Sequence, residues 1–97
     1  MEDTPVVRPN LLKQKLKANE QVIGVFMPLP SPQMVEVSAV AGFDFVLIDN
    51  EHGPLGPETA YAMVLAAESS GITQLVRVGN RDKQEVLKFL DLGAQGI

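Results

Sequence analysis

The sequence predicts an α/β fold in which parallel strands alternate with helices. Three short, mainly apolar runs at residues 22–27, 45–48 and 73–78 have the composition of buried strands. Helix-start and helix-stop signals lie between these runs. Because a strand, a helix and a second strand in this order form a right-handed crossover, the repeated pattern predicts a parallel sheet.

A first helix is expected to begin at Leu11. Asn10 is a favourable N-cap, and Leu11, Leu12 and Leu16 form one apolar stripe. The run 22–27 follows, with apolar residues at positions that alternate between both faces. This pattern predicts a first strand that is covered on both sides.

Ser31 followed by Pro32 predicts the start of a second helix, since serine is a preferred N-cap and proline is favoured in the first helical turn. The helix is expected to run to about Ala41. Gly42 can adopt the left-handed conformation that ends a helix. The second strand, residues 45–48, begins shortly afterwards.

Pro57 and Glu58 predict the start of a third helix, because proline suits its first turn and an acid suits the positive end of the helix dipole. Gly71 is expected to end this helix. The third strand, residues 73–78, follows directly. It is apolar except for polar residues at its start and an arginine near its end.

A fourth helix is expected next, where Asp82 and Glu85 resemble a capping box. Gly93 ends this helix, and Gly96 and Ile97 are interpreted as the start of a fourth strand. Two architectures fit this order of elements: a small open doubly wound sheet, or the amino-terminal part of a (β/α)8 TIM barrel.

The barrel is favoured because a small domain rarely finishes on two residues that are just entering a strand. A complete barrel needs roughly 250 residues. Residues 1–97 are therefore expected to form a single partial domain, made of an N-terminal helix, about three βα units and the start of strand four.

Composition excludes several classes of partner. The formal net charge of −4 argues against nucleic acid. No apolar stretch approaches membrane-spanning length, and the amino terminus does not resemble a secretory signal. The chain has no cysteine, which is compatible with a cytoplasmic location. We expect a cytoplasmic protein that binds neither nucleic acid nor membranes.

Ionisable side chains follow the second strand, at Asp49, Glu51 and His52. Ligands and catalytic groups in parallel α/β folds lie beyond the carboxyl ends of the strands. His52 could exchange protons near neutral pH, or make one structural hydrogen bond. Asp49 and Glu51 could steer a cation or orient a water molecule, or they could be solvated loop acids.

Arg77 interrupts the apolar third strand near its carboxyl end. A guanidinium at such a position needs an anionic partner, which could be an internal carboxylate or the carboxylate or enolate oxygen of a substrate. Both interpretations stay open from spacing alone. Asp91, near the end of the fourth helix, would by itself be interpreted as an exposed helix acid.

The run from Ala41 to Pro54 closely resembles the signature of the HpcH/HpaI aldolase family, which are class II aldolases that use pyruvate. Val76-Arg77-Val78 is similar to the arginine segment of that family's third strand, and residues 90–97 are similar to the helix end before its fourth strand. The resemblance covers nearly all of the chain. Asn50 departs from it, because glycine or threonine is common there in the family.

The resemblance implies a (β/α)8 barrel, usually assembled as a hexamer, that reversibly cleaves 4-hydroxy-2-oxo acids to pyruvate and an aldehyde. It implies that His52 is the general base or its water-activating partner, and that Arg77 holds pyruvate and stabilises the enolate oxygen. Asp91 would pair with a histidine, either within its subunit or across a subunit interface. Asp49 and Glu51 would belong to the hydrogen-bonded shell around a metal-bound water.

The resemblance also implies a divalent metal cofactor, Mg, Mn or Co, that acts as a Lewis acid. The family's direct metal ligands lie on later strands, so we expect them beyond residue 97 and expect no metal ligand within this chain. The 97-residue chain alone is therefore expected to be inactive. Two alternatives remain: a catalytically silent segment for folding or assembly, and a citrate-lyase-like acyl-CoA lyase.

Overall fold

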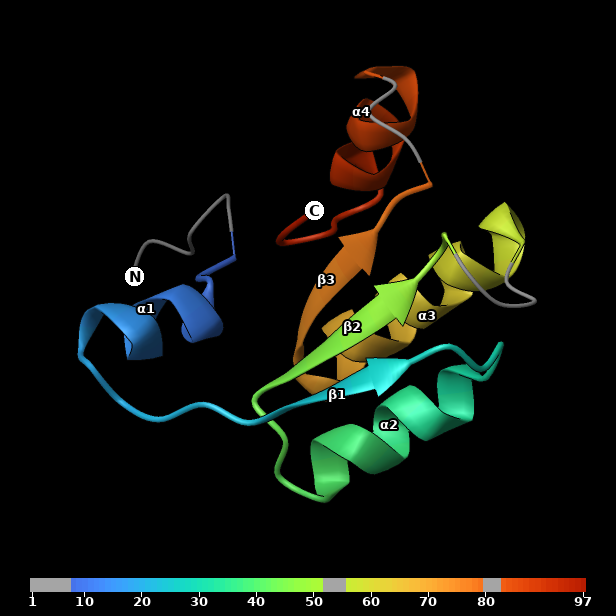
Figure 1. Ribbon diagram of the computed structural model, residues 1–97. Coiled ribbons are helices and arrows are strands. Elements are labelled where there is room, and N and C mark those ends of the chain that lie inside the picture. Colours follow the sequence, from blue (N-terminus) through green and yellow to red (C-terminus); the bar gives the residue numbers. More distant parts are fainter. Residues whose placement is uncertain (1–7, 52–55, 80–82) are drawn as a thin grey trace, which may run out of the picture.

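The structure is a computed structural model that describes residues 8–51, 56–79 and 83–97, and its elements follow the predicted order (Figure 1). Asp82 of the predicted capping box lies outside the described residues. None of the described helices is long and apolar enough to cross a membrane. The elements are α1 (Leu11–Lys17), β1 (Gly24–Met27), α2 (Pro32–Val40), β2 (Phe45–Asp49), α3 (Pro57–Ser70), β3 (Thr73–Arg77) and α4 (Lys83–Asp91).

The helix boundaries confirm the local signals. The side chains of Asn10 and Ser31 accept hydrogen bonds from backbone N–H groups three residues ahead and so cap α1 and α2. Gly42, Gly71 and Gly93 end three helices in the left-handed conformation, with φ values of 95°, 77° and 109°. These boundaries depend only on residues within one helical turn.

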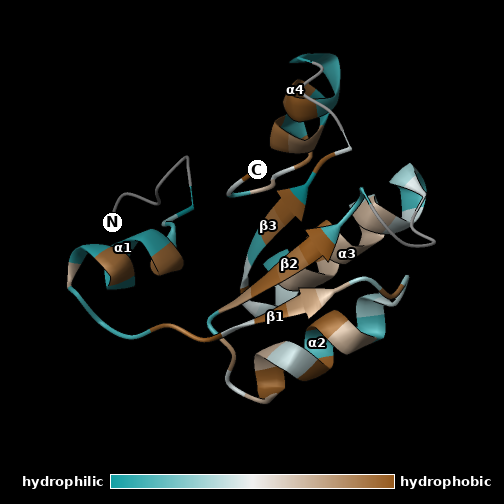
Figure 2. Cartoon of the chain, in the orientation of Figure 1, coloured by the Kyte–Doolittle hydropathy of each residue, from teal (hydrophilic) through white to brown (hydrophobic). Residues whose placement is uncertain are grey.

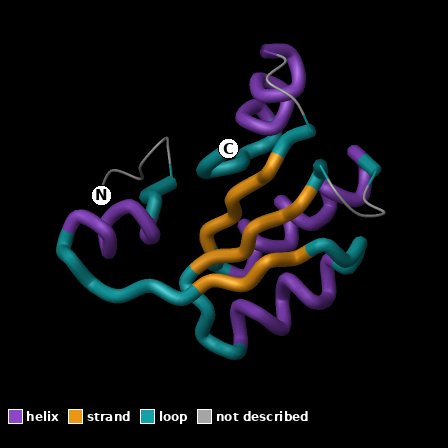
Figure 3. The backbone as a smooth tube through the Cα atoms, viewed as in Figure 1, coloured by secondary structure: helices purple, strands orange, loops and turns teal. Residues whose placement is uncertain are grey.

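The three strands form one parallel sheet in the order β1-β2-β3, and Gly96 adds a parallel bridge to Leu75 of β3 (Figure 3). Each strand therefore lies beside its predecessor in the chain. A doubly wound sheet instead reverses its strand order at a switch point and carries helices on both faces. The sequential order is that of consecutive strands in a barrel and agrees with the favoured architecture.

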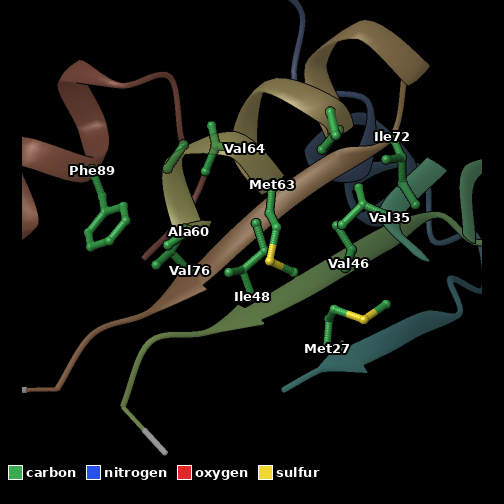
Figure 4. Packing of buried hydrophobic residues seen from close by; sticks show 13 residues of the cluster. Met27, Val35, Val46, Ile48, Ala60, Met63, Val64, Ile72, Val76 and Phe89 are labelled. Carbon is green, nitrogen blue, oxygen red and sulfur yellow. The ribbon is translucent and has the colours of Figure 1, made fainter. Parts of the chain in front are cut away.

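Helices α2 and α3 pack on the same face of the sheet. Val46 and Ile48 of β2 alternate onto this face, and they are fully buried with Val35 of α2 and Met63 of α3 (Figure 4). Val76 of β3 joins the same cluster. The core is therefore a layer of apolar side chains between the two helices and one side of the sheet.

The opposite face of the sheet is only partly covered by the described residues. Phe26 lies on this face of β1 and is 49% exposed. Figure 2 shows hydrophobic colour along most of β2 and along part of β3. The sequence pattern does indicate two apolar faces, but the described helices α2 and α3 cover only one of them.

Helix α1 lies near the amino ends of the strands, whose arrowheads point away from it (Figure 1). Asn10 Nδ2 donates to the carbonyl oxygen of Gln95 at 3.2 Å. Lys15 forms an ion pair with Asp44, and Asp44 Oδ2 also accepts from the backbone N–H of Ile23 at 2.8 Å. Asp44, just before β2, therefore bonds both to α1 and to the segment before β1.

We expect Asp44→Asn to lower the melting temperature near neutral pH. Hydrogen bonds from Lys15 and from the backbone of Ile23 lower the pKa of Asp44, so its contribution to stability is present above the carboxyl's unfolded pKa. That contribution is lost as pH falls through the folded pKa. The difference in melting temperature between wild type and Asp44→Asn should therefore shrink in acid, which thermal unfolding followed by circular dichroism can measure.

Alkaline pH tests the same ion pair through deprotonation of Lys15. The hydrogen bond to Asp44 raises the pKa of Lys15, so the ion pair is lost again as pH rises through that folded pKa. Glu36→Gln is the matched control, because Glu36 is an exposed acid on α2. A constant difference between wild type and Asp44→Asn across the whole pH range would contradict the assignment.

Candidate active site

Asp49 and Arg77 lie opposite each other at the carboxyl ends of β2 and β3, where the strand register pairs them directly. Arg77 Nε donates to Asp49 Oδ1 at 3.1 Å, and Nη2 donates to Asp49 Oδ2 at 2.9 Å. Two parallel bonds between a guanidinium and a carboxylate fix both groups in position and orientation. The sequence alone gave no indication that these two residues pair.

Asp49 is almost fully buried, at 1% exposure. A buried carboxylate is costly unless it is paired and hydrogen-bonded. Asp49 Oδ1 also accepts from the backbone N–H of Glu51 at 2.9 Å, so the carboxylate holds the start of the following loop as well as the arginine. Of the interpretations open for Asp49, the structure therefore excludes a solvated loop acid.

The guanidinium of Arg77 has two further neighbours. Its Cζ lies 5.0 Å from the centre of the Phe26 ring, a cation–π distance, and its Nε lies 3.6 Å from Glu51 Oε1. The hydrogen bonds that Arg77 donates to Asp49 raise the pKa of Arg77, which keeps the guanidinium charged. The Arg77 side chain is nevertheless 40% exposed.

This arrangement confirms that Arg77 has an internal partner, and it leaves room for an external one. Asp49 engages Nε and Nη2, while the side chain remains partly accessible at the edge where the strands end. A fixed, charged donor at this edge can bind a carboxylate or a developing oxyanion. Both interpretations drawn from the sequence are compatible with one geometry.

Sequence reasoning missed three residues around this pair: Phe26, Asn50 and Glu85. Asn50 donates its backbone N–H to the carbonyl oxygen of Arg77 at 2.9 Å, and its Nδ2 to Glu85 Oε1 at 3.2 Å. Asn50 departs from the family pattern, which was the one available signal for it. Phe26 and Glu85 come close only through strand register and the placement of α4, which the sequence does not display.

The remaining predicted site residues are not brought into this cluster. His52 lies outside the described residues. Asp91 is exposed at the last residue of α4. Among the described residues, no hydrogen bond or ion pair joins Asp91 to Asp49, Glu51 or Arg77, so its pairing with a histidine stays a prediction.

The described residues do not form a metal site. In residues 8–51, 56–79 and 83–97, no three His, Cys, Asp or Glu side chains are grouped so that they could hold a metal ion. Both oxygens of Asp49 accept hydrogen bonds from Arg77, which opposes direct ligation by this carboxylate. The expectation that metal ligands lie beyond residue 97 stays a prediction.

Comparison with known proteins gives one family. The family model described as HpcH/HpaI aldolase/citrate lyase matches residues 22–97. The chain is 38% identical over 88 residues to a hydroxypyruvate/pyruvate aldolase of Sagittula stellata, covering 91% of this chain and 35% of that protein. It is 36% identical over 88 residues to a 4-hydroxy-2-oxo-heptane-1,7-dioate aldolase of Salmonella dublin, covering 91% and 34%.

Solved structures agree with this result. The structure of citrate synthase SbnG matches with a TM-score of 0.83 and 42% identity, covering 89% of this chain and 35% of that one. An HpcH/HpaI aldolase from Desulfitobacterium hafniense matches with a TM-score of 0.78 and 34% identity, covering 86% and 32%. The chain therefore spans about a third of the length of the proteins that it matches.

Proposed function

Because this chain belongs to the HpcH/HpaI aldolase/citrate lyase family, we propose that the full-length protein carrying it is a carbon–carbon lyase that cleaves 4-hydroxy-2-oxo acids reversibly to pyruvate and an aldehyde. Relatives named as pyruvate aldolase and 4-hydroxy-2-oxo-heptane-1,7-dioate aldolase support this proposal. The observation that carries it is the Asp49–Arg77 pair, a fixed and partly accessible guanidinium at the strand ends.

The proposed reaction requires stabilisation of an enolate. A base removes the proton of the C4 hydroxyl group, the C3–C4 bond breaks, and its electron pair forms the enolate of pyruvate while the aldehyde leaves. Protonation at C3 then gives pyruvate. Arg77 would bind the 2-oxo acid and stabilise the negative charge that develops on the enolate oxygen. Asp49 would hold the guanidinium in place for that role.

His52 is proposed as the general base or its water-activating partner, by its match to the family signature. Glu51, whose carboxylate lies 3.6 Å from Arg77 Nε, is proposed to orient water at the same edge. Asp91 is proposed to pair with a histidine, in a homo-oligomer where two subunits meet. Its exposure on α4 is compatible with that role.

A divalent metal, Mg, Mn or Co, is the proposed cofactor, with its direct ligands beyond residue 97. When bound, it would supply Lewis-acid polarisation of the 2-oxo group. We propose a cytoplasmic location. The alternative of a catalytically silent segment for folding or assembly concerns the 97 residues by themselves.

The test is pyruvate release by the full-length protein. The purified protein would be stripped of metal with a chelator and then assayed with 4-hydroxy-2-oxo acids of different chain length, with Mg²⁺, Mn²⁺ or Co²⁺ added separately. Pyruvate would be measured with a coupled dehydrogenase. We expect release that depends on added metal. No release with any metal and any substrate would overturn the proposal.

Citrate formation is a second candidate, because the chain is 42% identical to the structure described as citrate synthase SbnG. Both candidates need a stabilised enolate, so the Asp49–Arg77 geometry suits either one. The same preparation would be assayed for citrate formation by mass spectrometry, and with acyl-CoA thioesters for the citrate-lyase-like alternative. Citrate formation without pyruvate release would favour this second candidate over the aldolase.

A further inference from the structure

Glu85 joins the chain segments that leave two neighbouring strands. It lies in the first turn of α4. Its Oε1 accepts from Asn50 Nδ2, one residue beyond β2, at 3.2 Å, and from the backbone N–H of Gly79, two residues beyond β3, at 3.5 Å. One carboxylate oxygen of α4 therefore contacts both the segment that follows β2 and the segment that follows β3.

These contacts surround the backbone of Arg77. Asn50 donates its backbone N–H to the carbonyl oxygen of Arg77 at 2.9 Å, while Gly79, the second residue beyond Arg77, is held by Glu85. Asp49 fixes the guanidinium itself. The hydrogen bond from the Asn50 side chain to Glu85 links the residue that contacts the Arg77 carbonyl to the residue that contacts Gly79. We call this hydrogen bond the Asn50–Glu85 bridge.

We propose that Asn50 and Glu85 are positioning residues for Arg77, acting through its backbone to aim the guanidinium at the 2-oxo acid. This inference rests on the proposed function. A glycine at position 50 would keep the backbone bond to Arg77 but could not make the bridge. The bridge is therefore a property of this chain's own asparagine, separate from the Asp49–Arg77 pair.

The strength of the Asn50–Glu85 hydrogen bond sets how much its loss should lower kcat/KM. A hydrogen bond to a charged acceptor is stronger than a neutral one, and Asn50 and Glu85 are both partly buried, so water competes only in part. We expect Asn50→Gly and Glu85→Ala each to lower kcat/KM for the 2-oxo acid by about 5- to 20-fold. Pyruvate affinity, measured by calorimetry, should fall by a similar factor.

Conservative and double substitutions separate positioning from a general loss of stability. Glu85→Gln keeps a neutral acceptor at the same place and should retain kcat/KM to within about threefold of wild type. The double variant should be no worse than the more affected single variant, because both changes remove the same interaction. Lys88→Ala is the matched control, since Lys88 is exposed one turn later on α4, and it should leave kcat/KM unchanged.

Amide hydrogen exchange tests the bridge without relying on activity. The N–H groups of Asn50 and Gly79 should be protected in wild type, and Gly79 should exchange faster in Glu85→Ala. Unprotected amides at both positions in wild type would overturn the proposal, even if a variant failed to fold. Wild-type kcat/KM and pyruvate affinity in Asn50→Gly would also overturn it.

The outcomes distinguish this inference from the proposed function. Absence of pyruvate release in the wild-type protein contradicts the aldolase proposal. Pyruvate release that is normal in wild type and equally normal in Asn50→Gly and Glu85→Ala contradicts the positioning role alone. Equal losses in Glu85→Gln and Glu85→Ala would likewise overturn it, because the retained acceptor would then have no effect.

Discussion

Replacing Arg77 with alanine in the full-length protein is expected to lower kcat/KM for cleavage of the 2-oxo acid by about 10²- to 10³-fold. The loss should be large because the guanidinium is already fixed before substrate arrives. Asp49 holds it through two hydrogen bonds and the Phe26 ring lies beside it. A donor that is preorganised toward a developing oxyanion contributes more than one that must reorganise.

Arg77→Lys tests whether geometry or charge alone is responsible. An ammonium group keeps the positive charge but cannot make the two-pronged contact with Asp49, so its position would no longer be fixed. We expect activity between those of Arg77→Ala and wild type. Initial rates across a range of substrate concentrations would show how the loss divides between kcat and KM.

The matched control for this prediction is Arg8→Ala. Arg8 is also partly exposed and also pairs with a carboxylate, that of Glu68, at 3.3 Å, but it lies near the carbonyl of Gly93, away from the strand ends. It should keep kcat/KM near the wild-type value. An Arg77→Ala variant as active as the Arg8→Ala variant would contradict the assigned role.

Replacing Phe89 with alanine is expected to lower the free energy of unfolding by about 3–5 kcal/mol. Phe89 is 2% exposed and belongs to the apolar cluster that α2 and α3 form with the sheet. Truncation removes buried apolar surface and leaves a cavity that close-packed neighbours cannot fill completely. Urea unfolding followed by circular dichroism would measure the change.

Val40→Ala is the control for this second prediction. Val40 is 90% exposed at the end of α2, so its truncation should change the free energy of unfolding by less than about 0.5 kcal/mol. A similar effect of the two substitutions would show that Phe89 is not part of the core. Because Phe89 and Glu85 share α4, the Phe89→Ala variant should also weaken the Asn50–Glu85 bridge.

The elements that the sequence predicted correctly are those whose signals are local. Asn10 and Ser31 cap helices through bonds to the third residue ahead, and Gly42 ends a helix through its own backbone conformation. Such features involve neighbours within one turn, so they can be read along the chain. The placement of Asp49 at a strand tip followed from the apolar run before it.

The contacts of the site depend on tertiary structure. Asp49 and Arg77 are 28 positions apart, and only the register of β2 against β3 makes them partners. Asn50 meets Glu85 because α4 returns over the strand ends. A one-residue shift in register would turn every side chain of a strand to the other face, and the local pattern does not specify which neighbour each strand takes.

The sequence by itself therefore determined the alternation of strands and helices, the family, and which residues carry charge at the strand ends. The tertiary structure decided the β1-β2-β3 order, the single face that α2 and α3 cover, and the pairing that buries Asp49 against Arg77. The physical reason is distance along the chain. Caps and apolar runs act over a few residues, whereas a buried ion pair forms only when packing brings separate strands together.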